Sequence, residues 1–507
     1  MLWRWAETMR FSKQFPCIIL IILLSVMIMP TGMFTITDDS TPGFIVSDSK
    51  EITGVPYVWQ EVNGFCFPSA LSMVLQSMGL DLSLYDILAT SGSGFSVVSV
   101  SMGKAMTLYP GVMVRQIPWF EFFSDLYGLE MQFYLDSSTD YGANALQMLK
   151  TMDCEITDYA DSGLITPQTV IRDSIDNGYP LAISVDTYYL PAEDWDVIRD
   201  YVGPMQPGGV GHAIVIVGYN DTAQDVRVYD PGVGLLGENY GYPGDGRWNY
   251  TMTYSQLDDA WRSAGYVTFR ISDGTGPVNE FEERLASYIA QRLLGNRTSY
   301  FEGAENFFYM GTGANAFRGM GLDMNIESIR DYCTYYLEID KPTAIRLLGH
   351  NLEVMMTMQY LAYRSSLESL PEIVPSMNLQ LFLDKAAAAL PHMEALSHNA
   401  SITSGIDIIS HDSLLYNTFF GMAETFEISH DLEEAISQYS EELVEISQHF
   451  IAIADAWESA GVALSAEIPG RPAGIGNFVV AIGGGAGILF IGVVLVLWRH
   501  NGKENEL

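Results

Sequence analysis

The sequence predicts an α+β domain followed by an all-α domain, with an apolar segment of membrane type near each end. In the first half, helical spacing gives way to short apolar runs separated by turn residues, and helices that precede a hairpin-bearing sheet are typical of the α+β class. Beyond about residue 278, apolar residues recur at helical spacing with acidic residues on the opposite faces, which predicts helices. The uninterrupted apolar runs near both ends predict the membrane segments.

Residues 1–33 have the pattern of a secretory signal or a signal anchor. Three basic residues precede an apolar run at 15–29, which Pro30, Thr31 and Gly32 close. No Ala-x-Ala-like site follows the run, so the sequence leaves open whether the segment is removed.

Residues 34–53 are rich in Thr, Asp, Ser and Gly without a period, which predicts a linker. The α+β domain then occupies residues 54–273. Two of its apolar runs flank the turn-rich NDTAQD and predict a hairpin. Helices are expected at Pro68–Met78, Ser96–Thr107 and Pro167–Asn177, and strands at Leu181–Val185, Ala213–Val217 and Val226–Tyr229.

Residues 278–466 predict the all-α domain. Stretches such as EFEERLASYIAQRLL and DLEEAISQYSEELVEISQHFIAIADAW place apolar residues on one helical face and acidic residues on the other. We expect this acidic surface to be available to an envelope partner.

No motif in the chain predicts a cofactor or a metal. His392 with His398, and His350 with Glu353, lie on expected helices but lack a third ligand. The glycine-rich GTGANAFRG, which begins at Gly311, does not follow an expected strand, so it does not predict a phosphate loop.

Residues 475–498 predict a transmembrane helix. The run from 478 to 498 has 21 residues without a charge, enough to span about 30 Å of hydrocarbon as a helix. Trp498 and the following Arg close it as an interfacial aromatic residue and a cytoplasmic stop charge, so the tail 499–507 is expected inside the cell. Both apolar segments therefore predict a cell-membrane protein with residues 34–474 outside the cytoplasm.

The charge of the chain excludes one class of partner. With 62 Asp and Glu against 25 Lys and Arg, the formal net charge is −37. Such a polyanion repels phosphate backbones, so no nucleic-acid partner is expected.

Four cysteines are too few for a disulfide scaffold, and the sequence leaves open whether Cys154 and Cys333 form a disulfide bond. Cys17, at the front of the first apolar run, is interpreted as an apolar residue.

The stretch VPYVWQEVNGFCFPSALSMVLQSMG has the features of a thiol nucleophile. Such a thiol needs a base, an oxyanion donor and preferably a helix N-terminus that stabilises thiolate. Pro68 and the apolar SALSMVL place Cys66 at the start of a helix. Gln60 lies six residues upstream, where its amide is able to turn back toward the same oxyanion.

The stretch GGVGHAIVIVGYNDTAQDVRVYDPG supplies the expected base and its partner. His212 begins a strand of buried type, and Asp230 follows the next strand across the hairpin. Adjacent antiparallel strands bring two such side chains together, so that the Asp orients the imidazole and stabilises the imidazolium. The spacing permits a Cys/His/Asp triad.

These residues resemble the papain-like cysteine peptidases, particularly the C39-like family. In that family a Gln precedes the catalytic Cys by the same interval, and a His, an apolar strand, Gly-Tyr and Asp-Pro follow in the same order. MTYSQLDDAW at 252–261 resembles the closing helix of the family. The resemblance implies that Cys66 is the nucleophile, His212 the general base and acid, Asp230 the group that orients His212, and Gln60 an oxyanion donor.

One departure from the family pattern concerns the residue after the nucleophile. The family commonly has Cys-Gly-Pro, whereas this chain has Phe67 before Pro68. Phe costs the backbone freedom that Gly gives beside the thiol, which argues against efficient proteolysis but not against the fold. A cleft filled by Phe65 or Phe67 would argue against an enzyme.

A second resemblance is to the family of butirosin biosynthesis protein H, through GYPLAISVDTYYLP and the His strand. That resemblance implies a papain-like acyltransferase with a helical C-terminal domain. Three functions are therefore weighed: a peptidase that cleaves peptide or protein substrates through a Cys66 thioester, an acyl or peptidyl transferase with the same Cys and His, and an envelope binding module without catalysis. The peptidase is preferred, because the Gln60 motif fits it better.

Overall fold

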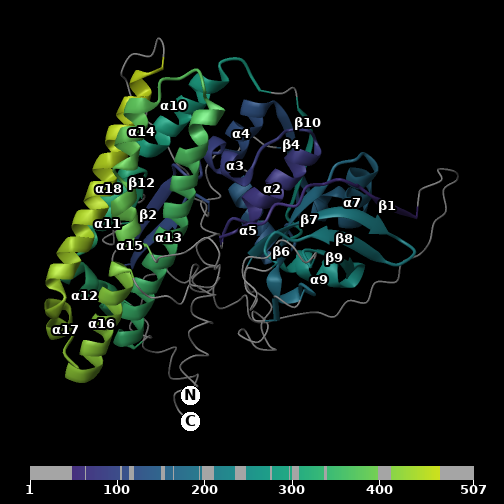
Figure 1. The fold of residues 1–507 in the computed structure, drawn as a ribbon. Coiled ribbons are helices and arrows are strands. Elements are labelled where there is room, and N and C mark those ends of the chain that lie inside the picture. The colour runs from purple at the N-terminus through teal and green to yellow at the C-terminus, as the bar shows by residue number, and fades with distance from the viewer. Residues whose placement is uncertain are drawn as a thin grey trace, which may run out of the picture. The chain divides into compact units, whose positions relative to one another are not determined.

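The structure is a computed structural model that describes residues 48–468, shown in Figure 1. The gaps in this range are 63, 103–104, 113–118, 150–154, 164, 193–194, 197–210, 234–246, 275–276, 296, 300–307, 336–339 and 398–412. The expected membrane segments at 1–33 and 475–498 and most of the expected linker lie outside the described residues. Within the described ranges, no helix combines the length and the apolar character needed to cross a membrane.

The first half of the described chain is a mixed α/β domain built on one large sheet. The strand order is β5-β4-β10-β6-β7-β8-β9, and β1 pairs with β7 outside this path. The described strands of this sheet are β1 Ser49–Glu51, β4 Leu129–Leu135, β5 Glu155–Asp158, β6 Leu181–Asp186, β7 Gly211–Asn220, β8 Asp225–Tyr229, β9 Asn249–Thr253 and β10 Thr268–Gly274. The helices of this half are α2 Cys66–Ser77, α3 Leu84–Thr90, α4 Trp119–Tyr127, α5 Asp140–Leu149, α6 Tyr159–Ser162, α7 Pro167–Asp176 and α9 Tyr254–Ser263.

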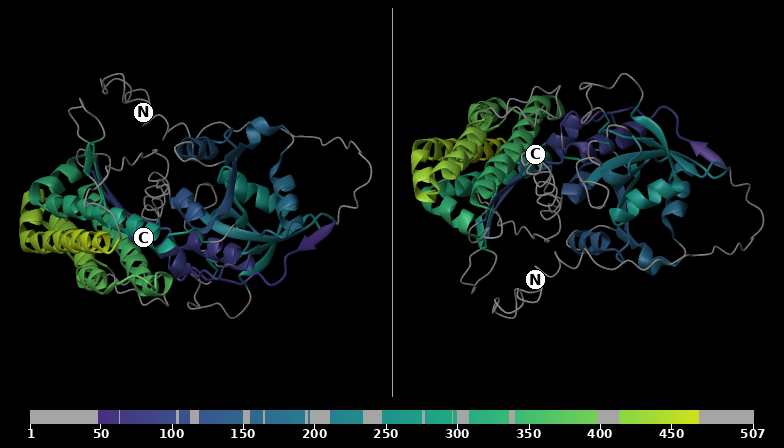
Figure 2. Two further views of the ribbon diagram at one scale, coloured as in Figure 1. Left: turned by 90° about the horizontal axis from the view of Figure 1, so that it is seen from above. Right: turned by 90° about the horizontal axis from the view of Figure 1, so that it is seen from below.

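The central strand β7 separates two hydrophobic cores. Successive side chains of a strand point to opposite faces of the sheet. Ala213, Val215 and Val217 therefore pack into the core that contains α2, whereas Ile214 and Ile216 pack into the core that contains α7 and α9. Figure 2 shows these helices against the strands from two sides. The sheet is thus covered on both faces, which explains the unbroken apolar run of β7.

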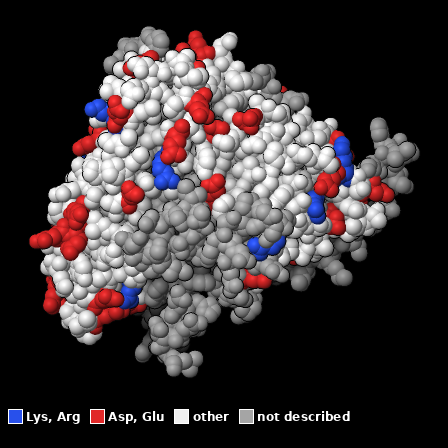
Figure 3. Space-filling model, viewed as in Figure 1, with Lys and Arg blue, Asp and Glu red and all other residues white. Residues whose placement is uncertain are grey.

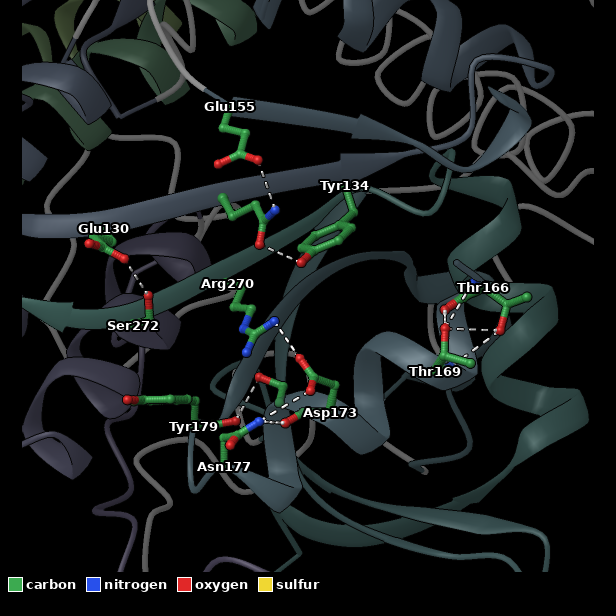
Figure 4. A network of polar contacts seen from close by, with 12 residues as sticks. Glu130, Tyr134, Glu155, Thr166, Thr169, Asp173, Asn177, Tyr179, Arg270 and Ser272 are labelled. Carbon is green, nitrogen blue, oxygen red and sulfur yellow. Dashed lines mark hydrogen bonds and ion pairs between the residues drawn. The ribbon is translucent and has the colours of Figure 1, made fainter. Parts of the chain in front are cut away.

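Polar contacts fix the outer part of the sheet and α7, as Figure 4 shows. Arg270 on β10 pairs with Asp173 on α7 at 2.6 Å. On β4, Tyr134 donates a hydrogen bond to Gln132 at 2.5 Å, and Gln132 in turn donates to Glu155 on β5 at 3.4 Å. These bonds link β10 to α7 and β4 to β5.

The hairpin of β7 and β8 forms as the sequence predicts. Val215 pairs with Tyr229, and the register shifts between Ile216 and Gly218. A Cβ at Gly218 would lie 2.9 Å from the carbonyl oxygen of Lys50, so a side chain there would collide with β1. The glycine therefore lets β1 pair with β7 at the bulge.

A second sheet corrects two expectations from the sequence. Residues 96–107, expected to be helical, form strands β2 Val97–Met102 and β3 Ala105–Pro110. The region expected to be all helical contributes β11 Arg297–Ser299 and β12 Phe308–Thr312, and the strand order is β11-β12-β2-β3. The Val and Ser residues of β2 fit a strand once β12 pairs with it, because strand preference depends on the neighbouring strands.

The remainder of the described chain is a helical region. Its helices are α10 Phe281–Leu294, α11 Ala314–Asp323, α12 Ile326–Tyr335, α13 Lys341–Ile373, α14 Gln380–Ala387, α15 Leu390–Leu396, α16 Leu414–Ser429, α17 Leu432–Gln438 and α18 Ser440–Ala466. The long α18 packs against α10, α11 and α14, and α13 packs against α16. The expected domain boundary between 273 and 278 stays a prediction, and β2 and β12 pair across it.

The glycine-rich stretch from Gly311 does follow a strand, contrary to expectation, because β12 precedes α11. A Cβ at Gly313 would lie 2.2 Å from the carbonyl oxygen of Arg292, and the Gly313 N–H donates to the carbonyl of Val97 at 3.0 Å. Ala314, the first residue of α11, is buried. Gly313 therefore allows the close approach of this turn to the end of α10.

Candidate active site

Cys66 is the first residue of α2 and is partly buried. The residue before the helix, Phe65, forms no side-chain cap hydrogen bond. The partial positive charge at a helix N-terminus favours an anion there, and a thiolate at the first position benefits from it. The local sequence therefore places Cys66 where a thiolate is stabilised.

His212 lies at the start of β7, and Asp230 directly follows β8. His212 Nε2 is 2.7 Å from Asp230 Oδ1. His212 is 4% exposed and Asp230 is fully buried, so water does not screen this pair. The antiparallel hairpin therefore brings together the two residues that the sequence proposed.

The side chains of Cys66 and His212 form a hydrogen bond. Because Nε2 of the imidazole is hydrogen-bonded to Asp230, Nδ1 is the nitrogen that faces the thiol. The helix α2 thus contributes the sulfur and the hairpin contributes the base.

Three groups that the sequence analysis missed bind the Asp230 carboxylate. Trp195 Nε1 donates to Oδ2 at 2.9 Å, and the Tyr250 hydroxyl donates to the same oxygen at 2.8 Å. The Gly232 N–H donates to Oδ1 at 2.8 Å. The Asp-Pro-Gly sequence signals the last bond, because an Asp side chain often accepts from a backbone N–H two residues later. Trp195 and Tyr250 carry no such signal.

These contacts set the charges of the pair. Burial acts to lower the pKa of His212, but the Asp230 carboxylate and the Cys66 side chain outweigh burial and raise it from 6.5 to about 10. Burial acts to raise the pKa of Asp230, but His212, Trp195 and Gly232 hold it below its ordinary value. At neutral pH the site therefore contains an imidazolium between a carboxylate and the thiol sulfur.

Gln60 is buried and is connected to the segment that follows Asp230. Its backbone N–H donates to the carbonyl of Pro231 at 3.0 Å. Its side-chain Nε2 donates to the carbonyl of Val62 at 3.1 Å, while Oε1 is buried without a partner among the described residues. One N–H of the amide is thus engaged, and the second remains as the candidate oxyanion donor.

The two phenylalanines beside the nucleophile pack into the interior. Phe65 is 1% exposed and lies in a cluster with Leu84, Leu88, Leu361 and Ala362. Phe67 packs against Phe269 of β10, with ring centroids 4.6 Å apart. Phe67 adopts helical geometry in α2, so the position does not need the backbone freedom of Gly. Phe65 is therefore held in the core, and Phe67 is partly buried against it.

The other candidate residues lie elsewhere. Cys333 is free and buried on α12, and burial raises the pKa of its thiol to about 12. His392 on α15 faces His449 on α18, with the two Nδ1 atoms 3.0 Å apart. Cys154 and His398 lie outside the described residues. Within the described part of the chain, no group of three His, Cys, Asp or Glu side chains has the arrangement of a metal site.

Comparison with known proteins shows a similarity to one family in the part of the chain that contains the site. Residues 52–268 match the family model described as Peptidase_C39 like family. The match contains Gln60, Cys66, His212 and Asp230. No curated protein matches the chain.

Proposed function

We propose that the protein is a cysteine peptidase that cleaves peptide bonds through a thioester on Cys66, because residues 52–268 match the model of the Peptidase_C39 like family. The observation that carries the proposal is the buried contact of 2.7 Å between His212 and Asp230, together with the hydrogen bond from His212 to Cys66. A thiol, a base and a group that orients the base are the parts that nucleophilic catalysis requires.

In the proposed reaction, the Cys66 thiolate attacks the carbonyl carbon of the scissile bond and forms a carbon–sulfur bond. The carbonyl electrons move to oxygen, and the resulting oxyanion accepts hydrogen bonds from donors such as the Gln60 amide. The carbon–nitrogen bond then breaks, and the leaving amine takes the proton from the His212 imidazolium. Water then attacks the thioester carbon while His212 takes its proton, the carbon–sulfur bond breaks, and the Cys66 thiolate and the His212 imidazolium are restored.

Asp230 has a positioning role in this proposal. Its carboxylate holds Nε2 of His212, so the ring presents Nδ1 to Cys66 and the imidazolium is stabilised. Trp195 and Tyr250 hold the carboxylate in turn. Because all these groups are buried or half-buried, the arrangement is set before a substrate binds.

We also propose that the protein lies in the cell membrane and that residues 54–273 and 278–466 form two domains. The apolar segments at 1–33 and 475–498 support a membrane protein with residues 34–474 outside the cytoplasm and a tail at 499–507 inside. Acidic side chains scattered over the face in Figure 3 would keep the body of the protein away from anionic lipid. The full-length protein should resist extraction from membranes by carbonate. A chain without residues 475–507 should become extractable if residues 1–33 are removed as a signal, and should stay in the membrane fraction if they remain as an anchor. Extraction of the full-length protein by carbonate would contradict the C-terminal anchor.

Thiol labelling tests the peptidase proposal before any substrate is known. Iodoacetamide should modify Cys66 at least about tenfold faster than Cys333 at neutral pH, because a thiolate is the reactive form. Labelling should be followed residue by residue by mass spectrometry, with Cys154 as a further reference. Slow and equal labelling of all three would contradict an activated thiol.

A peptide mixture then separates the alternatives. Release of new amines and acids that stops in Cys66→Ala but not in Cys333→Ala supports hydrolysis. A Cys66 thioester that passes its acyl group to an added amine rather than to water would instead favour the transferase. Binding of peptides that persists in Cys66→Ala without any cleavage by the wild type would favour the binding module.

A further inference from the structure

Helix α13 lies outside the residues that match the family, yet it contacts the loop that leads to the nucleophile. Phe65 belongs to one buried cluster with Leu361 and Ala362 of this helix and with Leu84 and Leu88 of α3. Val62, on the same loop, packs against the same cluster. The residue that precedes Cys66 is therefore buried against a helix from the C-terminal half of the chain.

A second contact lies at Gly64, two residues before Cys66. A Cβ at this position would lie 3.1 Å from the sulfur of Met358, so the Met358 side chain lies directly against the loop. Gly64 has a φ of +91°, a backbone conformation that favours glycine. The loop thus turns sharply where α13 supports it.

Gln359 fastens α13 to the α/β domain by two buried hydrogen bonds. Its Nε2 donates to the carbonyl of Gly94 at 2.9 Å, and its Oε1 accepts from the N–H of Gly111 at 3.0 Å. Gln359 is fully buried. A Cβ at Gly94 would lie 2.0 Å from Ser366 Oγ, so this close approach requires glycine. The position of α13 against the domain is therefore specific.

The loop has further support from α3. Glu61 has a φ of +57°, which is unusual for a residue with a side chain, and it accepts a hydrogen bond from the Tyr85 hydroxyl. Tyr85 lies on α3, and α3 packs against α13 (Figure 1). Strained loops persist only where their surroundings hold them. Here α3 and α13 form those surroundings.

We propose that α13 is a positioning element of the active site, in which Met358, Leu361 and Ala362 hold the Gln60–Cys66 loop in its catalytic arrangement. The proposal rests on the proposed cysteine peptidase function. Because Phe65 gives α2 no side-chain cap, packing fixes where the first turn of α2 begins. Space behind Phe65 would let Cys66 move relative to His212, which is held independently by the hairpin. The helical region is then part of the enzyme rather than a separate docking domain.

A matched pair of substitutions in α13 tests this role. Leu361→Ala opens space behind Phe65, whereas Leu352→Ala opens equal space on the α16 side. Leu352 lies one helical turn from Gly349, where a Cβ would lie 2.4 Å from Phe419 of α16. Both leucines are at least 97% buried, so both variants should lose similar thermal stability.

We expect Leu361→Ala to lower kcat and the rate of Cys66 alkylation about tenfold or more, with KM changed less than about twofold. Its alkylation profile should shift to higher pH, because the thiol loses its alignment with the imidazolium and the helix N-terminus. Leu352→Ala should keep both properties within about twofold of the wild type. The volume-conserving Leu361→Met should restore most of the lost rate.

The outcomes distinguish a positioning role of α13 in the active site from a contribution of α13 to stability alone. Equal losses in Leu361→Ala and Leu352→Ala, in proportion to their loss of thermal stability, would overturn the positioning role. If Leu361→Ala does not fold, Leu361→Val and Leu352→Val supply the same comparison with a smaller loss of volume. Failure of the proposed function looks different, because wild-type Cys66 would then react no faster than Cys333 in the same alkylation experiment.

Discussion

The two halves of the candidate active site are held in different ways. On the hairpin side, His212 and Asp230 form a buried pair, and the carboxylate accepts hydrogen bonds from Trp195, Tyr250 and Gly232. On the loop side, Gln60 and Glu61 accept or donate hydrogen bonds, whereas the side chain next to Cys66, that of Phe65, is held by apolar packing in a cluster with residues of α3 and α13. Hydrogen bonds therefore orient the imidazole of His212, whereas side-chain packing next to Cys66 positions the thiol.

Because of this difference, the two halves should respond differently to substitution. Hydrogen bonds between buried groups fix an orientation, and their loss leaves unpaired groups. Packing fixes a position only while its volume is filled. Substitutions on the hairpin side should therefore change the charge of His212 and the pH dependence of the rate. Substitutions behind the loop should instead change the position from which Cys66 attacks the substrate.

The largest effect should come from the loop side itself. Cys66→Ser replaces the thiolate by a hydroxyl that His212 deprotonates poorly, so kcat for peptide cleavage should fall about 10⁴ to 10⁶-fold. Cys333→Ser, which changes a buried thiol on α12, should leave kcat near the wild-type value. Measurement of both variants with one peptide mixture provides the comparison. Retained cleavage in Cys66→Ser would contradict the proposed nucleophile.

On the hairpin side, Asp230→Asn should change the pH dependence as well as the rate. The first contribution that raises the pKa of His212 is the charge of Asp230, so the amide should move that pKa down from about 10. The alkaline limb of kcat/KM should shift to lower pH, and kcat at pH 7 should fall about 10² to 10⁴-fold. An unchanged alkaline limb would show that another group sets it.

The same pair predicts how stability depends on pH. The pKa of His212 is higher in the folded protein than in an unfolded chain, so its stabilising contribution is complete below about pH 6.5. That contribution is lost as pH rises toward about 10. Urea unfolding across this window should show a steeper loss for the wild type than for Asp230→Asn. Parallel curves would contradict the raised pKa.

A smaller effect is expected from Gly232→Ala. A Cβ at this position would lie 2.8 Å from Cε1 of His212 and 2.9 Å from the Trp195 ring, so the imidazole must shift. A displacement of about 1 Å costs on the order of 10²-fold in rate, and kcat should fall by about that factor. Gly319→Ala on α11 is the control for a substituted glycine, since a Cβ there would make only an ordinary contact of 3.6 Å with Ser99 Oγ. Equal kcat in the two variants would indicate that the hairpin tolerates the displacement.

Local signals in the sequence were enough for much of this arrangement. The apolar run after Cys66 predicts α2, and the turn residues between β7 and β8 predict the hairpin that joins His212 to Asp230. Both features depend on residues close in the chain. The family match over 52–268 confirms the resemblance that these motifs suggested.

Features that depend on distant partners were not predictable in the same way. Residues 97–102 form a strand because β12 pairs with them from about 200 residues away. Trp195 and Tyr250 reach Asp230 only through the folded sheet. The cluster that contains Leu361 and Phe65 joins segments almost 300 residues apart, so no spacing rule reveals it. The sequence therefore indicated the candidate catalytic residues, but not the residues that hold them in place.

The smallest effect should separate the two donors to Asp230. Tyr250→Phe removes one hydrogen bond from a half-buried hydroxyl, and water is able to replace it. Trp195→Phe removes a donor that is 3% exposed and also a ring that packs 4.9 Å from the His212 ring. We therefore expect kcat to fall less than about threefold in Tyr250→Phe and about tenfold in Trp195→Phe, the latter equivalent to about 1.4 kcal/mol. The reverse order would mean that the hydroxyl, rather than the buried indole, holds the carboxylate that orients the base.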